Sequence, residues 1–421
     1  MPRPLVFLLL FAAVGCGPRS APTAKVPVPT GPPAAAEPEK RNLVTLTPAA
    51  AAKVRGLMKE DGYPYLRVRV DEALDQKLDL ESTYNPVDDL LGESGGVQIV
   101  VDRKSAGMLA DGLTVDYVDT DGLKGFKFVA PKRKPAITAA TLPDARKGFV
   151  TKLARRESAN EPLDQPPAKV FRVVRYESPA GGLAAYLTPD PQDGKKHPAI
   201  VWVTGGDCNT IGEVWNDRPA ANDQTAGQFR KAGVVLMFPS LRGGNQNPGV
   251  REGFLGEVDD VLAAAEYLRK LPYVDPARVY LGGHSTGGTL VLLAAASSDK
   301  FRAVFSFGPV DDVAGYGPQY VPCDLSDPKE LELRSPGRWA NTIRVPTFVF
   351  EGTVGGNTDS LTEMAKASTN PNMRFFPVRG ANHFNLLAPI NTLIAGRVLK
   401  DTGEKCDLAF TEGELNRLFE K

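Results

Sequence analysis

Hydrophobic residues follow two different spacings in the second half of the chain. Residues 199–203, 234–238 and 279–281 are short runs that are apolar throughout, which is typical of strands buried on both faces of a sheet. Residues 257–271 instead carry their apolar side chains on one helical face, and a helix is also expected at 387–399. Strands that alternate with helices predict an α/β fold with a mainly parallel sheet and helices on both of its faces.

A smaller pattern precedes it, between residues 42 and 131. Thr47 and Pro48 lead into the alanine-rich segment 49–59, which predicts a capped helix that ends at Gly62. Runs of β-forming residues follow at 66–70, 97–101, 113–118 and 125–129, with a short helix expected at 103–109. This order predicts a small α+β domain in front of the larger one.

Proline-rich segments flank the two predicted domains. Residues 17–41 are rich in Pro, Ala and Thr, and residues 132–169 carry several prolines, with a short helix expected at 145–157. Such segments bury little apolar surface, so we expect a tether before the small domain and a linker after it. The large domain is then expected to span 170–402, with a tail at 403–421.

The first residues resemble the leader of a bacterial lipoprotein. Arg3 precedes the apolar run 5–14, and the leader ends in Ala13-Val14-Gly15-Cys16. This string is similar to a lipobox, whose cysteine is lipidated and becomes the mature N-terminus, although Ala13 stands where leucine is usual. The resemblance implies a signal peptide at 1–16 and an exported protein that an acyl chain on Cys16 holds at a membrane surface, on the periplasmic or extracellular side. An ordinary cleaved signal peptide is the alternative.

The charge balance bears on the class of partner, and the cysteines bear on whether the protein contains a disulfide. The chain has 421 residues, and its 50 basic side chains equal its 50 acidic ones, so no nucleic-acid partner is expected. Outside the leader the cysteines are Cys208, Cys323 and Cys406. An exported protein permits disulfides, so a Cys323–Cys406 pair and three free thiols both remain open.

A serine in a tight turn is the main candidate for chemistry. Ser285 is the centre of Gly283-His284-Ser285-Thr286-Gly287, directly after the strand-like run 279–281 and before the helix-like run 289–296. A Gly-x-Ser-x-Gly string between a strand and a helix is the setting of a nucleophile elbow, because the glycines permit a strained turn. The following helix brings backbone N–H groups toward an anion formed at the serine.

His383 is the candidate base among only three histidines. A serine hydroxyl needs a base within hydrogen-bonding reach. His197 stands in a polar turn before a strand, and His284 lies beside the serine with its side chain expected to point away from it. His383 follows the last predicted strand, at 373–378, where the histidine of an α/β-hydrolase fold stands.

The acid that orients this histidine is expected after the second-last predicted strand. The usual string there is a strand, a glycine, two residues and an aspartate, but Gly355 occupies the place of the aspartate. Asp359, in the same loop, is the first choice for the acid. Asp311 or Asp312, after the preceding strand, and Glu351 are the alternatives.

Two N–H donors are needed to bind the oxyanion of acyl transfer. Thr286, directly after the serine, is expected to supply one. The turn Thr204-Gly205-Gly206-Asp207 is expected to supply the other from Gly206 or Asp207, because glycine lets the backbone approach a ligand closely.

Several further strings resemble the prolyl oligopeptidase (S9) family of α/β hydrolases. They are Pro239 with Arg242-Gly243-Gly244, then Gly256-Glu257-Val258-Asp259-Asp260, Tyr273-Val274-Asp275-Pro276, and residues 282–288. The resemblance covers residues 170–400 and implies an acyl-enzyme mechanism on an ester or peptide, without a cofactor. Glu257, Asp259 and Asp260 stand at a helix start, where negative charge favours the helix dipole, so a structural role is expected for them. The small domain stands where that family has a large propeller.

The small domain itself resembles the A-type iron–sulfur carrier (HesB-like) fold. The similar strings are Leu46-Thr47 with its alanine-rich helix, Val100-Val101-Asp102 with Ser105, and Gly125-Phe126-Lys127-Phe128. That family binds its cluster through three cysteines, whereas residues 42–131 contain none. Because a cluster needs soft thiolate ligands, no metal is expected, and the remaining role is structural or a docking surface.

Together these features predict a membrane-tethered serine hydrolase, peptidase-like or esterase-like. Its catalytic group would be Ser285, His383 and Asp359. The rival hypothesis is a non-catalytic lipoprotein in which both domains are binding scaffolds, which the missing cluster cysteines and the unusual acid loop would favour.

Overall fold

The computed structural model describes residues 41–70, 76–109, 112–120, 123–129, 140–317, 320–325 and 327–420. The predicted signal peptide, its Cys16 and most of the predicted tether lie outside these residues. Within the described part of the chain, no helix has both the length and the apolar character needed to cross a bilayer.

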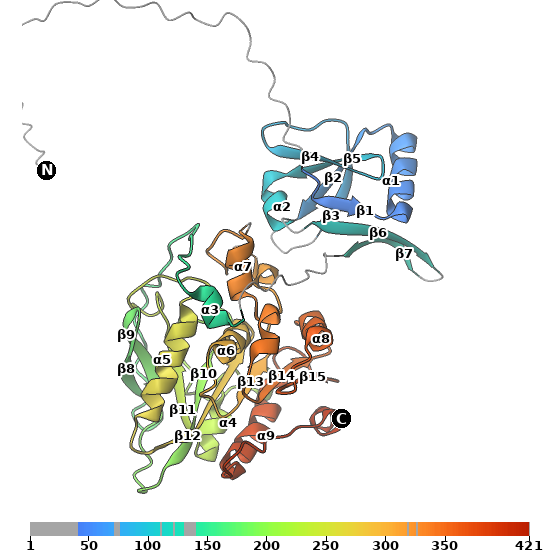
Figure 1. Ribbon diagram of the computed structural model, residues 1–421. Helices are drawn as coiled ribbons and strands as arrows, with labels where there is room; N and C mark the ends of the chain where they lie inside the picture. Colours follow the sequence, from blue (N-terminus) through green and yellow to red (C-terminus); the bar gives the residue numbers. More distant parts are fainter. Residues whose placement is uncertain are drawn as a thin grey trace, which may run out of the picture.

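The small domain has two sheets and two helices (Figure 1). One sheet has the strand order β1-β6-β7 and the other the order β3-β2-β5-β4. The strands are β1 (Val44–Leu46), β2 (Tyr65–Val70), β3 (Gln76–Glu81), β4 (Asp89–Ser94), β5 (Val97–Asp102), β6 (Leu113–Thr120) and β7 (Leu123–Val129). The helices are α1 (Pro48–Asp61) and α2 (Arg103–Met108). This confirms the predicted α+β domain.

The start and end of α1 follow the signals in its sequence. The Thr47 hydroxyl accepts a hydrogen bond from the Ala50 N–H at 3.2 Å, which satisfies one of the free donors of the first turn. Gly62 adopts the left-handed conformation with φ of 75° and ends the helix. Ala50, Ala51 and Val54 are buried, so this face of α1 packs into the domain core.

The large domain is built on an eight-stranded sheet with the order β15-β14-β13-β12-β10-β11-β9-β8. Its strands are β8 (Arg172–Ser178), β9 (Gly181–Leu187), β10 (His197–Val203), β11 (Val235–Pro239), β12 (Val274–His284), β13 (Val304–Phe307), β14 (Thr347–Gly352) and β15 (Met373–Val378). β10 to β15 run parallel, and the hairpin β8–β9 adds an antiparallel edge next to β11. The mainly parallel α/β-hydrolase sheet is confirmed.

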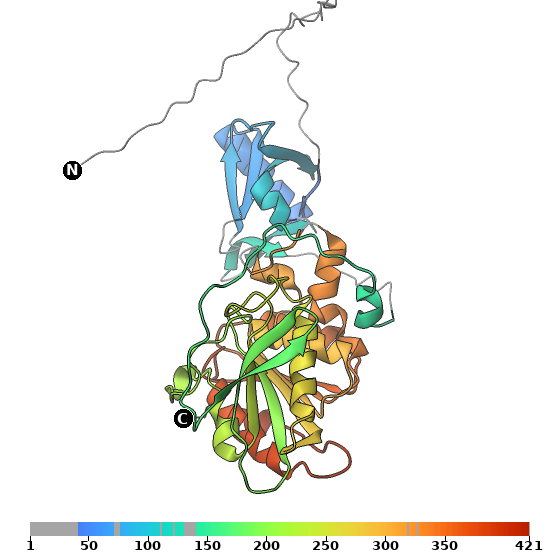
Figure 2. The same ribbon diagram turned by 90° about the vertical axis from the view of Figure 1, so that its left-hand side faces the viewer.

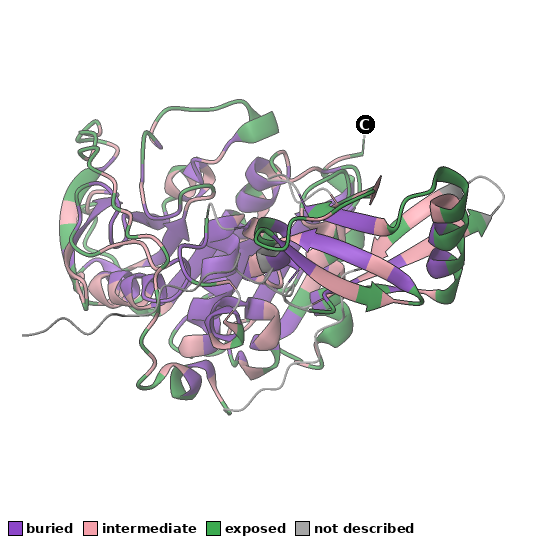
Figure 3. Ribbon diagram, turned by 90° about the horizontal axis from the view of Figure 1, so that it is seen from above, coloured by how far each residue is buried: buried purple, intermediate pink, exposed green. Residues whose placement is uncertain are grey.

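Helices cover both faces of this sheet, as the alternation along β10 shows. Ala199 and Val201 belong to the core that includes the helices α5 and α6, whereas Ile200 and Trp202 belong to the core that includes α4 and α9. The helices are α4 (Gly227–Ala232), α5 (Glu257–Arg269), α6 (Thr286–Ser297), α7 (Pro328–Arg334), α8 (Thr358–Ala367) and α9 (Leu387–Lys400). Seen from above, the buried residues gather in the strands and in the helix sides that face them (Figure 3).

The segments on either side of 170–402 also pack on this domain. The helix α3 (Leu142–Arg146) inserts a fully buried Leu142 into the core of the α5 face, and the chain after it runs over the outside of the domain (Figure 2). The helix α10 (Glu412–Arg417) buries Leu415 on the opposite face. The linker prediction is therefore wrong from residue 140 onward, and the tail is part of the domain. The helix expected at 145–157 is instead the shorter α3, which ends at Arg146. The buried residues of these segments are isolated rather than periodic, so the sequence did not show that the segments pack on the domain.

The described cysteines Cys208, Cys323 and Cys406 are free thiols. Cys323 lies in the core on the α5 side of the sheet, whereas Cys406 packs against the core on the α9 side. Because the sheet separates these two thiols, the disulfide alternative is wrong for this structure.

Candidate active site

The strained turn at Ser285 is the centre of the site. Ser285 joins the end of β12 to the start of α6 with φ of 57° and ψ of −117°, a backbone conformation that costs free energy for a residue with a side chain. Its N–H donates to the Phe307 carbonyl on β13 at 2.7 Å, which holds the turn against the neighbouring strand. A Cβ on Gly283 would lie 2.5 Å from the Gly287 carbonyl oxygen, so glycine is required there.

His383 lies in the turn after β15 and forms a hydrogen bond with Glu351. Its Nδ1 is 2.8 Å from Oε2 of Glu351, the second-last residue of β14. Glu351 is fully buried and also accepts the N–H of Gly352 on Oε1 at 2.7 Å and the N–H of Asn357 on Oε2 at 3.1 Å. A carboxylate at Nδ1 keeps the proton on that nitrogen, which leaves the Nε2 lone pair free to accept a proton from a nucleophile.

The end of β13 connects the histidine to the serine. Phe307 accepts the Ser285 N–H, and the next residue, Gly308, lies against the hydrogen-bonded His383 and Glu351. A Cβ on Gly308 would lie 2.4 Å from Cε1 of His383 and 2.6 Å from Oε2 of Glu351. The absence of a side chain at Gly308 therefore lets His383 and Glu351 approach the strand end that fixes the serine turn.

Asp359, the first choice for the acid, does not occupy this place and is replaced by Glu351. Asp359 is exposed in the first turn of α8. Asp311 accepts from the Ser360 hydroxyl at 2.7 Å, and Asp312 accepts from the Ala314 N–H at 3.0 Å, so both have other described partners. A glutamate is one methylene longer than an aspartate, so it reaches the histidine from the strand itself rather than from the loop beyond it.

The predicted oxyanion residues lie together beside the serine. The Thr286 hydroxyl donates to the Gly206 carbonyl at 2.8 Å, which ties the start of α6 to the turn after β10. A Cβ on Gly205 would lie 3.2 Å from Cβ of Ser285, so this turn passes close to the nucleophile. The side chain of Asp207 accepts from Arg251 Nη2 at 2.5 Å, so it is bonded within the protein.

A cavity of about 100 Å³ opens at these oxyanion residues. Its lining includes Gly206, Asp207, Cys208, Thr286, Phe254 and Tyr320. Burial raises the pKa of the Cys208 thiol, so this sulfur stays protonated and is a poor nucleophile. The cavity therefore combines the aromatic rings of Phe254 and Tyr320 with polar groups such as Asp207, and it reaches Thr286, the residue after the serine.

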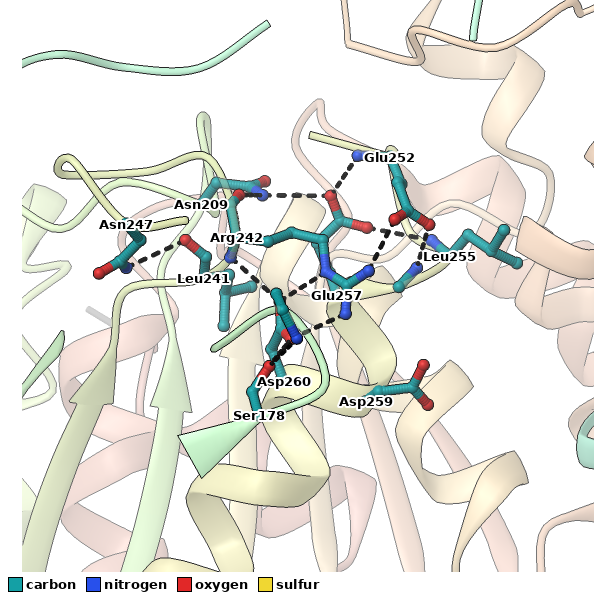
Figure 4. Close-up of polar contacts among 12 residues, drawn as sticks. Ser178, Asn209, Leu241, Arg242, Asn247, Glu252, Leu255, Glu257, Asp259 and Asp260 are labelled. Atoms are coloured by element: carbon teal, nitrogen blue, oxygen red, sulfur yellow. Dashed lines mark hydrogen bonds and ion pairs between the residues drawn. The ribbon is translucent and has the colours of Figure 1, made fainter. Parts of the chain in front are cut away.

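Buried charges hold the wall of this cavity (Figure 4). Arg242 donates from Nε and Nη2 to the two carboxylate oxygens of Asp260, each at 2.9 Å, and from Nη1 to Glu252 at 2.6 Å. Glu257 is fully buried and accepts the N–H groups of Glu252 at 2.7 Å and of Gly253 at 3.1 Å. These contacts fix the loop that carries Phe254 into the cavity. The carboxylates of Glu257 and Asp260, at the start of α5, are thus bonded to other groups of the protein.

We expect the loss of the Arg242 side chain to destabilise the protein. Arg242→Met leaves the carboxylate of Asp260, which is fully buried, without its cation, and such a loss lowers the free energy of unfolding by about 3–5 kcal/mol. Arg218→Met removes the exposed ion pair with Glu213 and should change it by less than about 1 kcal/mol. Urea unfolding of both variants measures the difference. Equal stability of the two variants would contradict the structural role of Arg242.

Family comparisons match the two domains separately. Residues 222–328 match the prolyl oligopeptidase family, and residues 43–140 match the iron–sulphur cluster biosynthesis family. An uncharacterized protein from the nifU 5′ region of Cereibacter sphaeroides is 34% identical over 98 residues, which are 22% of this chain and 91% of that protein. The chain joins a domain of the iron–sulphur cluster biosynthesis family to a domain of the prolyl oligopeptidase family.

Curated peptidases are similar to parts of the prolyl oligopeptidase domain. Dipeptidyl-peptidase 5 of Porphyromonas gingivalis is 31% identical over 125 residues, which are 28% of this chain and 18% of that protein. The uncharacterized peptidase YtmA of Bacillus subtilis is 28% identical over 185 residues, 39% of this chain and 66% of that protein. The chain thus spans less than two thirds of each. The solved structure of Pyrococcus horikoshii acylaminoacyl peptidase aligns with 59% of this chain and 44% of its own at 19% identity and a TM-score of 0.45.

The iron–sulphur family domain lacks the ligands that a cluster needs. No cysteine occurs between residues 42 and 131. The buried charged residues Arg67 and Asp89 are hydrogen-bonded to each other at 2.7 Å, and the Arg67 guanidinium lowers the pKa of the Asp89 carboxyl. Hard carboxylates and cations do not replace thiolates around iron, so these residues do not fit a cluster.

Proposed function

We propose that the prolyl oligopeptidase domain is a serine hydrolase that cleaves peptide or ester bonds through an acyl-enzyme. The observation that carries this proposal is the buried Glu351 bonded to Nδ1 of His383, beside the strand end that holds the strained Ser285 turn. A nucleophile, an oriented base and oxyanion donors are the three parts that acyl transfer requires. All three come from the carboxyl ends of neighbouring parallel strands.

The reaction follows from these positions. Ser285 attacks the substrate carbonyl carbon while Nε2 of His383 takes the hydroxyl proton, and Glu351 stabilises the imidazolium that forms. The N–H of Thr286 and an N–H of residues 206–207 bind the oxyanion. His383 then protonates the leaving amine or alcohol. Water, deprotonated by the same imidazole, attacks the acyl-enzyme, releases the acid product and restores the serine.

Peptide amides are the substrate class that the family relationship favours. The related proteins of Porphyromonas gingivalis and Bacillus subtilis are named as peptidases. A panel of prolyl, alanyl and bulkier peptide amides, together with simple acyl esters, tests the class on purified protein. Cleavage of an amide supports a peptidase, whereas cleavage of esters alone supports an esterase. No turnover of any substrate would favour the alternative of a non-catalytic scaffold.

We also propose that Cys16 carries a lipid that holds the protein at a membrane surface. The apolar run 5–14 followed by Cys16 supports it. Growth with a labelled fatty acid should label the wild-type chain and leave the Cys16→Ser variant unlabelled. Equal labelling of both would contradict the proposal, and labelling of neither would favour an ordinary cleaved signal peptide.

A further inference from the structure

His284, the residue before the nucleophile, is buried against the catalytic histidine. Its side chain packs on the ring of His383, with ring centroids 4.6 Å apart. His284 is 2% exposed, and its Nε2 lies 2.9 Å from the backbone carbonyl oxygen of His383. The ring of Phe384 covers another side at 5.6 Å.

The position of the proton on His284 follows from this contact. A carbonyl oxygen only accepts, so Nε2 of His284 must carry the hydrogen and donate it. Burial and, to a smaller extent, the nearby His383 lower the pKa of His284 to about 3, so the ring stays neutral near pH 7. Nδ1 is then an acceptor, and among the described residues it has no hydrogen-bond partner. The donated hydrogen bond is therefore the polar contact that His284 makes with its side chain.

His284 fills the space between two parts of the active site. On one side is the turn of His383, and on the other is the turn after β10, where a Cβ on Gly205 would lie 2.9 Å from Nδ1 of His284. The His383 turn is also held to the strands by the bond from Nδ1 of His383 to Glu351 on β14 and by backbone contacts. Its Ala381 carbonyl accepts the Val354 N–H at 3.0 Å, and Asn382 bonds within the turn to Asn385 at 2.7 Å.

We propose that His284 is a positioning residue that holds the backbone of His383, so that Nε2 of His383 meets the hydroxyl of Ser285. The proposal rests on the serine hydrolase function proposed above and adds a residue that acts through the position of His383. Its neutral ring donates one hydrogen bond to the His383 turn and separates that turn from Gly205 by a fixed distance. A displacement of about 1 Å between base and nucleophile lowers such rates by up to about 100-fold.

The test compares two substitutions by their reaction with a fluorophosphonate, which labels an activated serine. His284→Phe keeps a flat ring and removes the N–H donor, whereas His284→Gln places an amide N–H at a similar reach. We expect the maximal labelling rate to fall on the order of 10- to 100-fold in the Phe variant, with the half-saturating concentration changed by less than about twofold. The Gln variant should recover to within about threefold of wild type. Wild-type labelling of the Phe variant, or equal losses in both variants, would overturn the proposal.

A second readout separates this proposal from the proposed function. The Nδ1 proton of His383, bonded to Glu351, gives an NMR signal whether or not the protein is a hydrolase. If the wild-type protein does not react with the fluorophosphonate, the hydrolase proposal fails. The positioning role of His284 is then tested only by the exchange rate of the Nδ1 proton of His383. We expect its exchange with water to be at least about 10-fold faster in the Phe variant than in wild type and the Gln variant. Equal exchange in all three proteins would overturn the role of His284.

Discussion

Ser285→Ala is expected to abolish hydrolysis, lowering kcat by about 10⁶-fold on any substrate that the wild type cleaves. The hydroxyl of Ser285 is the atom that attacks the substrate, and alanine removes it with little change in volume. The turn itself is held by the Ser285 N–H, which donates to the Phe307 carbonyl at 2.7 Å and is retained in the variant. We therefore expect the variant to remain folded. Initial-rate kinetics and thermal unfolding of the same preparation measure the two effects.

Ser297→Ala is the matched control for this loss. Ser297 is the last residue of α6, and its hydroxyl donates to the Leu293 carbonyl at 2.9 Å, at the other end of the helix from the nucleophile. Its kcat should stay within about twofold of wild type, because surface changes away from the site have small effects. Residual activity of Ser285→Ala above a few per cent of wild type would mean that another group carries the reaction.

Glu351→Gln should give the second-largest loss, with kcat about 10⁴-fold lower. The amide of glutamine would donate to Nδ1 of His383, where the carboxylate now accepts. That reversal places the ring proton on Nε2, which in the proposed mechanism accepts the hydroxyl proton of Ser285 and could then no longer do so. KM should change little, because Glu351 is fully buried and orients the base rather than the substrate.

Asp359→Asn distinguishes the two candidate acids. Asp359 is exposed in the first turn of α8, so its amide should leave kcat within about twofold of wild type. Steady-state kinetics of the two variants on one substrate decide between them. A large loss of kcat in Asp359→Asn with little loss in Glu351→Gln would identify Asp359, in the loop after β14, as the acid. It would contradict the geometry described above.

The nucleophile, the base and the sheet could be predicted because local sequence determines each of them. The Ser285 turn is specified by its own glycines and by the strand and helix on either side. The apolar runs of β10 to β15 are buried on both faces and therefore continuous in sequence. His383 was identified because few histidines compete for the role.

Glu351 could not be preferred among the candidate acids, and the contact of His284 with His383 could not be predicted, because both depend on distances across the sheet. Glu351 ends a strand and looks like an ordinary strand residue until β15 and the turn of His383 are placed beside it. His284 is next to the serine in sequence, but its partner is the carbonyl of a residue that is 99 positions away. No local pattern reports such a pairing.

The strands missed in the small domain have a related cause. β3 reads QKLDLE and β4 reads DLLGES, and each is an edge strand of its sheet with several partly exposed residues. An edge strand buries less apolar surface, so its sequence lacks the apolar run that marks a central strand. β1 is only three residues long and gives no periodic signal at all.

The most direct test of the hydrolase assignment is the site at which a fluorophosphonate becomes attached to the wild-type protein. We expect a single adduct, formed by the loss of fluoride, on the peptide that contains Ser285 in intact-mass and peptide-mapping spectra. We also expect a denatured sample to give no adduct, because the reaction needs His383 beside the serine. An unmodified Ser285 in the folded protein, or an adduct on another residue, would contradict the hydrolase assignment.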